Sequence, residues 1–254
     1  MQDALAALNA GGTITFPKGT YEEDLVLDKD MTVVNAGGAR FAGKVTIQDA
    51  KVDMTRPTFW DNATFSVEGT KPFTMSEGYV SKAATVNLNT SGDISVLNTN
   101  FWNEGNETNS AVTLGQNTKK AMLARNVFHN SQSNGVVRIQ GGEDVKLHTN
   151  SFVSMKAADN PFVISAPVPA LEVRANSVVY TGDATDSTAL CRFQKTKETG
   201  EKEFANTTVT FNSDNKANDV KYSNESAGLQ TAFVVFSNKN NKITSDNPTV
   251  NWVQ

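Results

Sequence analysis

The chain has 254 residues, enough for one large β domain or two smaller ones, and a formal net charge of −4 with both signs mixed throughout. This balance provides no basic field for nucleic acid and no polybasic segment for an anionic membrane surface, so we expect neither partner. The single cysteine, Cys191, excludes an intrachain disulfide, and the strongest apolar run, Ala232 to Phe236, is far too short to span a bilayer.

The N-terminal residues predict a cap followed by strands. Gln2 to Asn9 is typical of a short amphipathic helix, and the glycine pair after it ends the helix. Thr13 to Tyr21 then reads as a strand, a Pro-Lys-Gly turn and the start of a second strand, which Leu25 to Leu27 continues. Because stacked strands leave unpaired backbone at the first coil, we expect the helix to cover that edge.

This opening resembles that of the pectate-lyase-like right-handed parallel β-helix superfamily. A helix, Gly-Gly, Thr-Ile-x-Phe-Pro and Gly-Thr-Tyr follow in that order between Gln2 and Tyr21. The superfamily includes pectin lyases, polygalacturonases, other polysaccharide-acting enzymes and bacteriophage tailspike proteins. The resemblance therefore implies the fold but does not decide the activity. The polygalacturonase motifs Asn-Thr-Asp, Asp-Asp, His-Gly and Arg-x-Lys are absent, and Arg138-Ile139-Gln140 lacks the closing lysine.

Apolar residues recur with a fixed spacing. In each copy two inward candidates stand two residues apart and a third follows five positions later, as in these sets: Met31, Val33, Gly38; Val52, Met54, Phe59; Phe73, Met75, Val80; Ile94, Val96, Phe101; Ala121, Leu123, Phe128; Val145, Leu147, Phe152; Leu171, Val173, Val178. The period is 21 residues up to Ile94 and then 27, 24 and 26, which is the range of a solenoid coil. Two residues before the last four third positions stand Thr99, Asn126, Asn150 and Asn176, which predicts a polar ladder at a corner.

A second set of alternating strands lies between the first: Val45/Ile47, Phe65/Val67, Val86/Leu88, Val112/Leu114, Val137/Ile139 and Phe162/Ile164. Two interleaved sets predict at least two parallel sheets. Residues one repeat apart match in type and order, which stacking explains and a sandwich of antiparallel strands does not. We expect the hand to be right, as in nearly all parallel crossovers.

The C-terminal quarter follows the repeat less clearly. Residues 194–206 are charged and poor in strand formers, which predicts an inserted, solvated loop. Residues 207–254 are expected to supply the final strands and a C-terminal cap. We therefore predict one all-β domain over residues 1–254, a right-handed parallel β-helix of about eight coils with an N-terminal cap at residues 1–12. Cys191 falls at an inward position and is expected in the core.

Five charged residues are predicted to lie close together on adjacent coils: Arg125, Lys146, His148, Glu172 and Arg174. A polysaccharide lyase needs a cation to neutralise a uronate carboxylate and a base to remove the adjacent proton, and this patch contains both kinds of group. The alternative is that Lys146 and Glu172 form an ion pair on neighbouring strands beside two solvated arginines. We favour the alternative, because structural ion pairs outnumber catalytic ones.

Ligand-binding candidates follow from the outward positions. Those expected to contact a glycan are Arg125, Lys146 and Arg174 through their charge and Trp102 and Tyr180 through ring stacking. Trp60 is a further stacking candidate, although Trp60 and Trp102 each follow an anchor phenylalanine and packing at a corner is favoured for both. Asp93 and Asp144 begin non-adjacent coils, so the carboxylates are not clustered for a metal. We predict no metal site and no cofactor.

Two classes of function remain. The solenoid walls are rich in Asn, Thr and Ser, and the two close carboxylates that a glycoside hydrolase requires are not apparent. We therefore expect a non-enzymatic structural or adhesive protein on a virion (tailspike-, fibre- or decoration-like) or on a cell surface. Its expected partners are a polysaccharide or cell-surface glycan, identical subunits in a trimer, or virion proteins. The alternative is a lyase or hydrolase acting on an acidic polysaccharide. An extracellular or virion location is expected, although no signal peptide is visible at the N-terminus.

Overall fold

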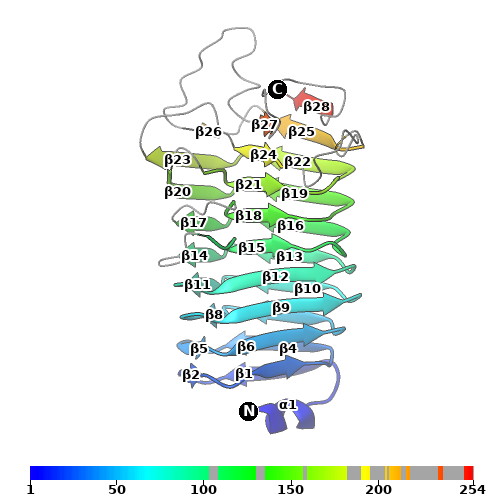
Figure 1. Cartoon of the computed structure of the whole chain (residues 1–254). Coiled ribbons are helices and arrows are strands. Elements are labelled where there is room, and N and C mark those ends of the chain that lie inside the picture. The colour runs from blue at the N-terminus through cyan, green and yellow to red at the C-terminus, as the bar shows by residue number, and fades with distance from the viewer. Residues whose placement is uncertain are drawn as a thin grey trace.

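The computed structural model of the protein describes residues 1–102, 108–129, 135–156, 159–181, 190–194, 204, 206–212, 216–217, 234–236 and 249–253, with side chains up to residue 210. These residues form a parallel β-solenoid, a rod in which each turn of the chain lies on the turn before it (Figure 1). The predicted all-β solenoid of about eight coils is confirmed, because strands β1 to β24 make eight coils of three strands. Strands β25 to β28 extend the stack at the C-terminal end.

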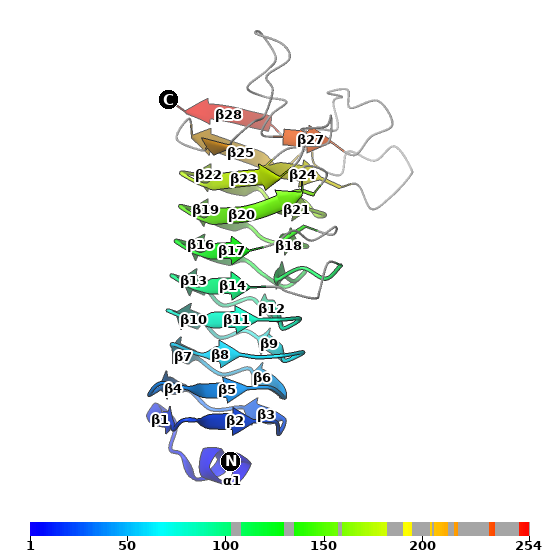
Figure 2. The same cartoon turned by 90° about the vertical axis from the view of Figure 1, so that its left-hand side faces the viewer.

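The three strands of a coil belong to three different sheets. Sheet A has ten strands, in the spatial order β1 (Gly12–Phe16), β4 (Met31–Asn35), β7 (Val52–Thr55), β10 (Phe73–Ser76), β13 (Ile94–Leu97), β16 (Lys120–Ala124), β19 (Asp144–His148), β22 (Ala170–Arg174), β25 (Thr208–Asn212) and β28 (Thr249–Val253). Sheet B, which faces the viewer in Figure 2, has nine strands: β2 (Gly19–Tyr21), β5 (Ala39–Phe41), β8 (Thr58–Phe59), β11 (Tyr79–Ser81), β14 (Asn100–Trp102), β17 (Val127–His129), β20 (Ser151–Lys156), β23 (Ser177–Thr181) and β26 (Lys216–Ala217). Sheet C also has nine: β3 (Leu25–Leu27), β6 (Lys44–Gln48), β9 (Thr64–Gly69), β12 (Thr85–Thr90), β15 (Val112–Leu114), β18 (Val137–Ile139), β21 (Phe162–Ile164), β24 (Cys191–Phe193) and β27 (Val234–Phe236).

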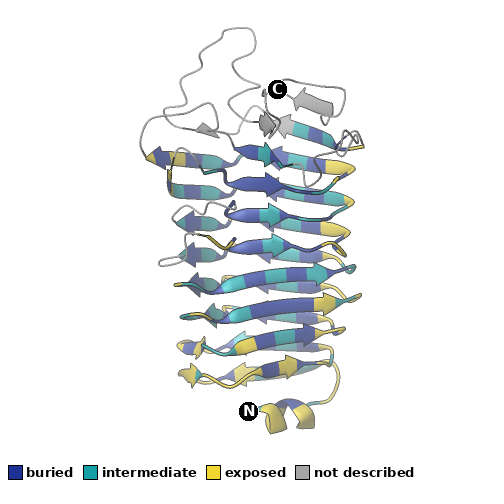
Figure 3. Cartoon of the chain, viewed as in Figure 1, coloured by how far each residue is buried: buried dark blue, intermediate teal, exposed yellow. Residues whose placement is uncertain are grey.

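The register of the sheets follows the repeat in the sequence. In sheet A, Ile94 pairs with Phe73 on one side and with Ala121 on the other, as the spacing predicts. In sheet B, Phe128 lies between Phe101 and Phe152, with ring centroids 4.6 and 4.9 Å away. These side chains are fully buried, and the interior of the rod is lined with buried residues along its length (Figure 3). Each buried Phe contributes roughly 1.5 to 3 kcal/mol of hydrophobic stabilisation before entropy is subtracted.

The third position of each repeat lies in a separate sheet because the chain turns sharply before it. The residue that follows each of the six sheet A strands from β7 to β22 adopts a left-handed backbone conformation, with φ between 50° and 58°: Arg56, Glu77, Asn98, Arg125, Thr149 and Ala175. This turn divides what the sequence presents as one set of anchors between sheets A and B. In the second coil Met31 and Val33 pair with Val52 and Met54 as predicted, but the third anchor is wrong, because Phe41, and not Gly38, stands opposite Phe59.

The predicted asparagine ladder is confirmed at this A–B corner. Asn150 Nδ2 donates to Leu123 O (2.9 Å) and to Asn176 Oδ1 (3.0 Å), and Asn150 Oδ1 accepts from the backbone and side-chain nitrogens of Asn126 (3.1 and 3.0 Å). Asn126 Oδ1 in turn accepts from Thr99 N (3.0 Å). The three asparagines are fully buried, so every coil in this part of the rod is hydrogen-bonded to the next at the same place.

The N-terminal cap is shorter than predicted. Helix α1 spans Gln2–Ala7, and within it only Leu5 is buried. The Gln2 side chain exchanges two hydrogen bonds with the backbone of Val26, at 3.1 Å each, and so takes the place of a neighbouring strand at the edge of sheet C. A side-chain amide carries the same donor and acceptor as a peptide group, which explains this pairing.

The C-terminal predictions fall largely outside the described residues. Within residues 194–206, Phe204 is buried and its ring packs edge-on against Phe193 with centroids 5.3 Å apart, so this part of the segment is not the solvated loop that its composition predicts. Cys191 is buried in the core, as predicted, and burial raises the pKa of its thiol. Among the described helices, none has the length and apolarity needed to cross a membrane.

Candidate functional site

The charged residues singled out in the sequence lie partly together on the outer face of sheet A. Lys146 pairs with Glu172 across β19 and β22, and His148 pairs with Arg174. Side chains two apart on a strand share a face, so these four point the same way. Arg125 is set apart from them, because it is the left-handed residue at the A–B corner, with φ 58° and an exposed side chain.

The ion pairs in this group differ from the predicted pair. Lys146 Nζ lies 4.0 Å from Asp144 Oδ2 on its own strand, and His148 Nε2 lies 3.3 Å from Glu172 Oε2. His148 Nε2 is buried, and its contact with Glu172 is not aligned as a hydrogen bond. A shallow hollow of about 260 Å³ beside Glu172 is lined by Asp144 and Thr210, among others. The arrangement is a set of partly exposed ion pairs on an open wall, each worth at most about 1 kcal/mol.

The aromatic candidates Trp60 and Trp102 are half-buried, at the ends of β8 and β14 in sheet B. Arg40 and Lys82 lie over the Trp60 ring, 4.6 and 5.0 Å from its centroid. The Trp102 ring packs against His129, with centroids 4.1 Å apart. A sugar stacks on the face of a ring, and here those faces already contact cations or a neighbouring ring. The geometry favours packing along the wall for both tryptophans.

Tyr180 is not a surface residue, contrary to the sequence interpretation. It is only 6% exposed and stands opposite Met155, with a register irregularity between Phe152 and Met155. Strand β23 is five residues long and alternates regularly, so Val178 and Tyr180 point inward and Val179 outward. Burial disfavours the charged phenolate and so raises the pKa of the Tyr180 hydroxyl. Tyr180 therefore packs in the core and does not contact a ligand on the wall.

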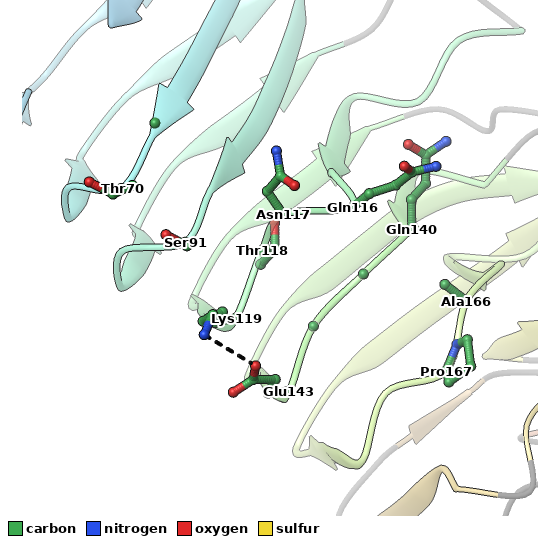
Figure 4. Close-up of a pocket in the computed structure, with 13 residues that line it drawn as sticks. Thr70, Ser91, Gln116, Asn117, Thr118, Lys119, Gln140, Glu143, Ala166 and Pro167 are labelled. Atoms are coloured by element: carbon green, nitrogen blue, oxygen red, sulfur yellow. Dashed lines mark ion pairs between the residues drawn. The ribbon is translucent and has the colours of Figure 1, made fainter. Parts of the chain in front are cut away.

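The sequence did not predict a further hollow on the described part of the surface, a groove of about 680 Å³ where the chain passes from sheet C to sheet A (Figure 4). Its lining comes from five successive corners: Gly69 and Thr70; Ser91; Gln116, Asn117, Thr118 and Lys119; Gln140, Gly141, Gly142 and Glu143; Ala166 and Pro167. The groove thus runs along the rod from one coil to the next. We call it the corner groove.

The corner groove arises from a change in corner length. Three residues join sheet C to sheet A in the third and fourth coils (70–72 and 91–93), whereas five, four and five do so in the next three coils (115–119, 140–143 and 165–169). The longer corners are held firmly on the coils below. Gly115 N donates to Leu88 O (2.7 Å) and Gln140 N to Leu114 O (2.8 Å). The backbone of the groove is therefore fixed before any ligand arrives.

Glycine lets the coils approach closely on the floor of the groove. A Cβ added to Gly141 would lie 2.7 Å from the carbonyl oxygens of Gly115 and Gln116, which is closer than atoms in contact allow. Gly141 therefore allows the backbones of two successive corners to lie in direct contact. In the preceding corner, residues 115–119, the hydroxyl of the buried Thr118 donates to Leu88 O (3.1 Å) and holds the corner on the coil below.

The walls of the corner groove are mainly uncharged and polar. The amides of Gln116, Asn117 and Gln140 make no side-chain hydrogen bond to another residue in the described part of the chain. Gln116 and Gln140, both labelled in Figure 4, belong to successive corners of the groove. Among the described residues that line the groove, only Lys119 and Glu143 are charged, and they form an exposed pair with Nζ–Oε1 at 3.5 Å. Each free amide offers both donors and acceptors to a ligand.

The residues that the structure describes contain no group of three or more His, Cys, Asp or Glu arranged to hold a metal ion. Comparisons with known proteins find no protein-family model, no curated protein and no solved structure that matches this chain.

Proposed function

We propose that the protein is a non-enzymatic structural or adhesive β-solenoid, presented on a virion or a cell surface, that binds glycans along its side. The observation that carries the proposal is the corner groove, with its fixed backbone and free amides. Sugar hydroxyls both donate and accept hydrogen bonds, as side-chain amides do. We further propose kinship with the pectate-lyase-like superfamily, which the parallel coils and the Gln2 to Tyr21 opening support.

The rod itself suits display. Its coils repeat the same buried column and the same asparagine ladder, so stability grows by contacts between neighbouring coils. Such a solenoid holds a side groove in a fixed shape at a distance from its base. Identical subunits packed side by side as a trimer, or other virion proteins, are the partners proposed for such a rod.

A second candidate function is lyase activity on an acidic polysaccharide. The proximity of Lys146, His148 and Glu172 on one open wall favours it, since a cation, a base and a carboxylate are brought together. Against it, these groups already have partners. Glu172 Oε2 lies 3.3 Å from His148 Nε2, and Lys146 Nζ lies 4.0 Å from Asp144 Oδ2. Arg174 is a neighbour of His148 that would hold an acidic glycan in either case.

A panel of neutral and uronate polysaccharides tests both functions. Binding, reducing ends and the ultraviolet absorbance of unsaturated products are followed in the same samples. The adhesive function predicts binding without new reducing ends or unsaturated products. Unsaturated products that disappear in Lys146→Ala would establish the lyase instead. If uronate polymers bind the sheet A wall and reach the A–B corner beside it, Arg174→Ala should weaken their binding, and Arg125→Ala should weaken it further, while the far-ultraviolet circular dichroism stays unchanged.

A further inference from the structure

We infer that the ligand of the corner groove is an uncharged, linear saccharide that lies lengthwise along the rod. This inference rests on the proposed glycan binding and adds the class of saccharide, its direction and its contacts. It follows from the course of the groove, from its charge and from its free hydrogen-bonding groups.

The course of the groove sets the direction of the ligand. The lining residues run from Thr70 in the third coil through Ser91, Gln116 and Gln140 to Pro167 in the seventh. Four steps between strands of about 4.8 Å give a length of about 19 Å. A ligand that fills the groove is therefore long and narrow, as a linear oligosaccharide is. A monosaccharide would touch only one or two corners.

The charge of the groove selects a neutral ligand. Lys119 and Glu143 neutralise each other, and no other charged residue lines the groove in the part of the chain that the structure describes. A uronate chain would meet the Glu143 carboxylate without an unpaired cation in the lining, and would lose the hydration of its own charges. Arg125, one of the residues proposed to contact a uronate polymer, lies at the A–B corner, on a different edge of the coil.

The free amides supply the contacts. Gln116 and Gln140 belong to successive corners, so their side chains would hydrogen-bond successive parts of one chain. Their backbones are held by the coil below, and only the side chains must be ordered when the ligand binds. Toward the other end of the groove Ser91 adds a hydroxyl group, and Thr70 adds a hydroxyl oxygen that can still accept, since its proton is donated to Asp49 Oδ1 (2.9 Å). One net hydrogen bond changes the affinity roughly fivefold.

Titration calorimetry with linear oligomers of glucose, galactose or mannose, and with uronate oligomers of equal lengths, tests the inference. For the neutral sugar that binds, affinity should rise with chain length until the chain reaches about 19 Å and then level off. Gln116→Ala and Gln140→Ala should each weaken the longest chain roughly fivefold. Asn87→Ala is the matched control, because it removes an amide from the outer wall of sheet C away from the groove lining, and it should bind as the wild type does.

Circular dichroism of each variant first establishes that the fold is intact. Binding that does not depend on chain length, tighter binding of uronate oligomers, or wild-type affinity in both glutamine variants would overturn the inference and leave glycan binding itself in place. If the wild-type protein binds no saccharide of either series, the proposed function fails, and the inference fails with it.

Discussion

Replacing Asn150 by alanine should destabilise the solenoid more than its single amide suggests. The side chain makes four hydrogen bonds in a fully buried site: two donated, to Leu123 O and Asn176 Oδ1, and two accepted, from Asn126. Alanine leaves the Asn126 N–H without this acceptor and Leu123 O without this donor. Each buried group left unpaired costs about 1 to 3 kcal/mol, so we expect a loss of about 2 to 6 kcal/mol.

Equilibrium unfolding in guanidinium chloride, followed by far-ultraviolet circular dichroism, measures this loss. Asn87→Ala is a suitable control, since Asn87 is a half-buried amide on the outer face of sheet C and its removal should change the free energy by no more than about 0.5 kcal/mol. Asn150→Asp keeps an acceptor but places a carboxylate opposite two oxygens, and should be at least as damaging at neutral pH. A loss below about 0.5 kcal/mol for Asn150→Ala would refute the role of the ladder.

Three further predictions concern the core and the sheet B wall. Phe128→Ala should cost about 3 to 5 kcal/mol in the same unfolding assay, because its ring is stacked between two others, and a cost below about 1 kcal/mol would contradict the column. Burial lowers the pKa of His129, so the unfolded chain binds a proton first and stability should fall as the pH drops below about 6.5. His129→Gln should show a smaller fall between pH 7.5 and 5, and an equal fall would rule out this residue as the cause. Cys191 should react with a thiol reagent only after denaturation, and rapid labelling of the folded protein would contradict its burial.

The repeating part of the fold is predictable from the sequence because each coil repeats the environment of the one before. Ile94 and Ala121 are 27 residues apart and occupy the same inward position, and the same holds for Phe101 and Phe128. The asparagine ladder is visible for the same reason. The third sheet is not, because the turn at Asn98 depends on one left-handed residue whose identity varies from coil to coil.

The candidate site is less predictable. Tyr180 looks like an outward residue only until the full length of β23 is known, since alternation along the strand returns it to the core. The corner groove depends on corner lengths that change between coils, and a repeat alignment treats such changes as insertions. A sequence signal for the groove was present in the amide and glycine residues that follow two strands of sheet C: Gln116 after β15, and Gln140, Gly141 and Gly142 after β18.

The most direct measurement is a crystal structure of the protein with the neutral oligosaccharide that binds most tightly. We expect electron density for an extended chain in the corner groove, between Thr70 and Pro167, with sugar hydroxyls within hydrogen-bond distance of the Gln116 and Gln140 amides. Density for the saccharide beside Lys146 and Glu172 on the sheet A wall, with the groove empty, would contradict the assignment of the corner groove as the glycan site.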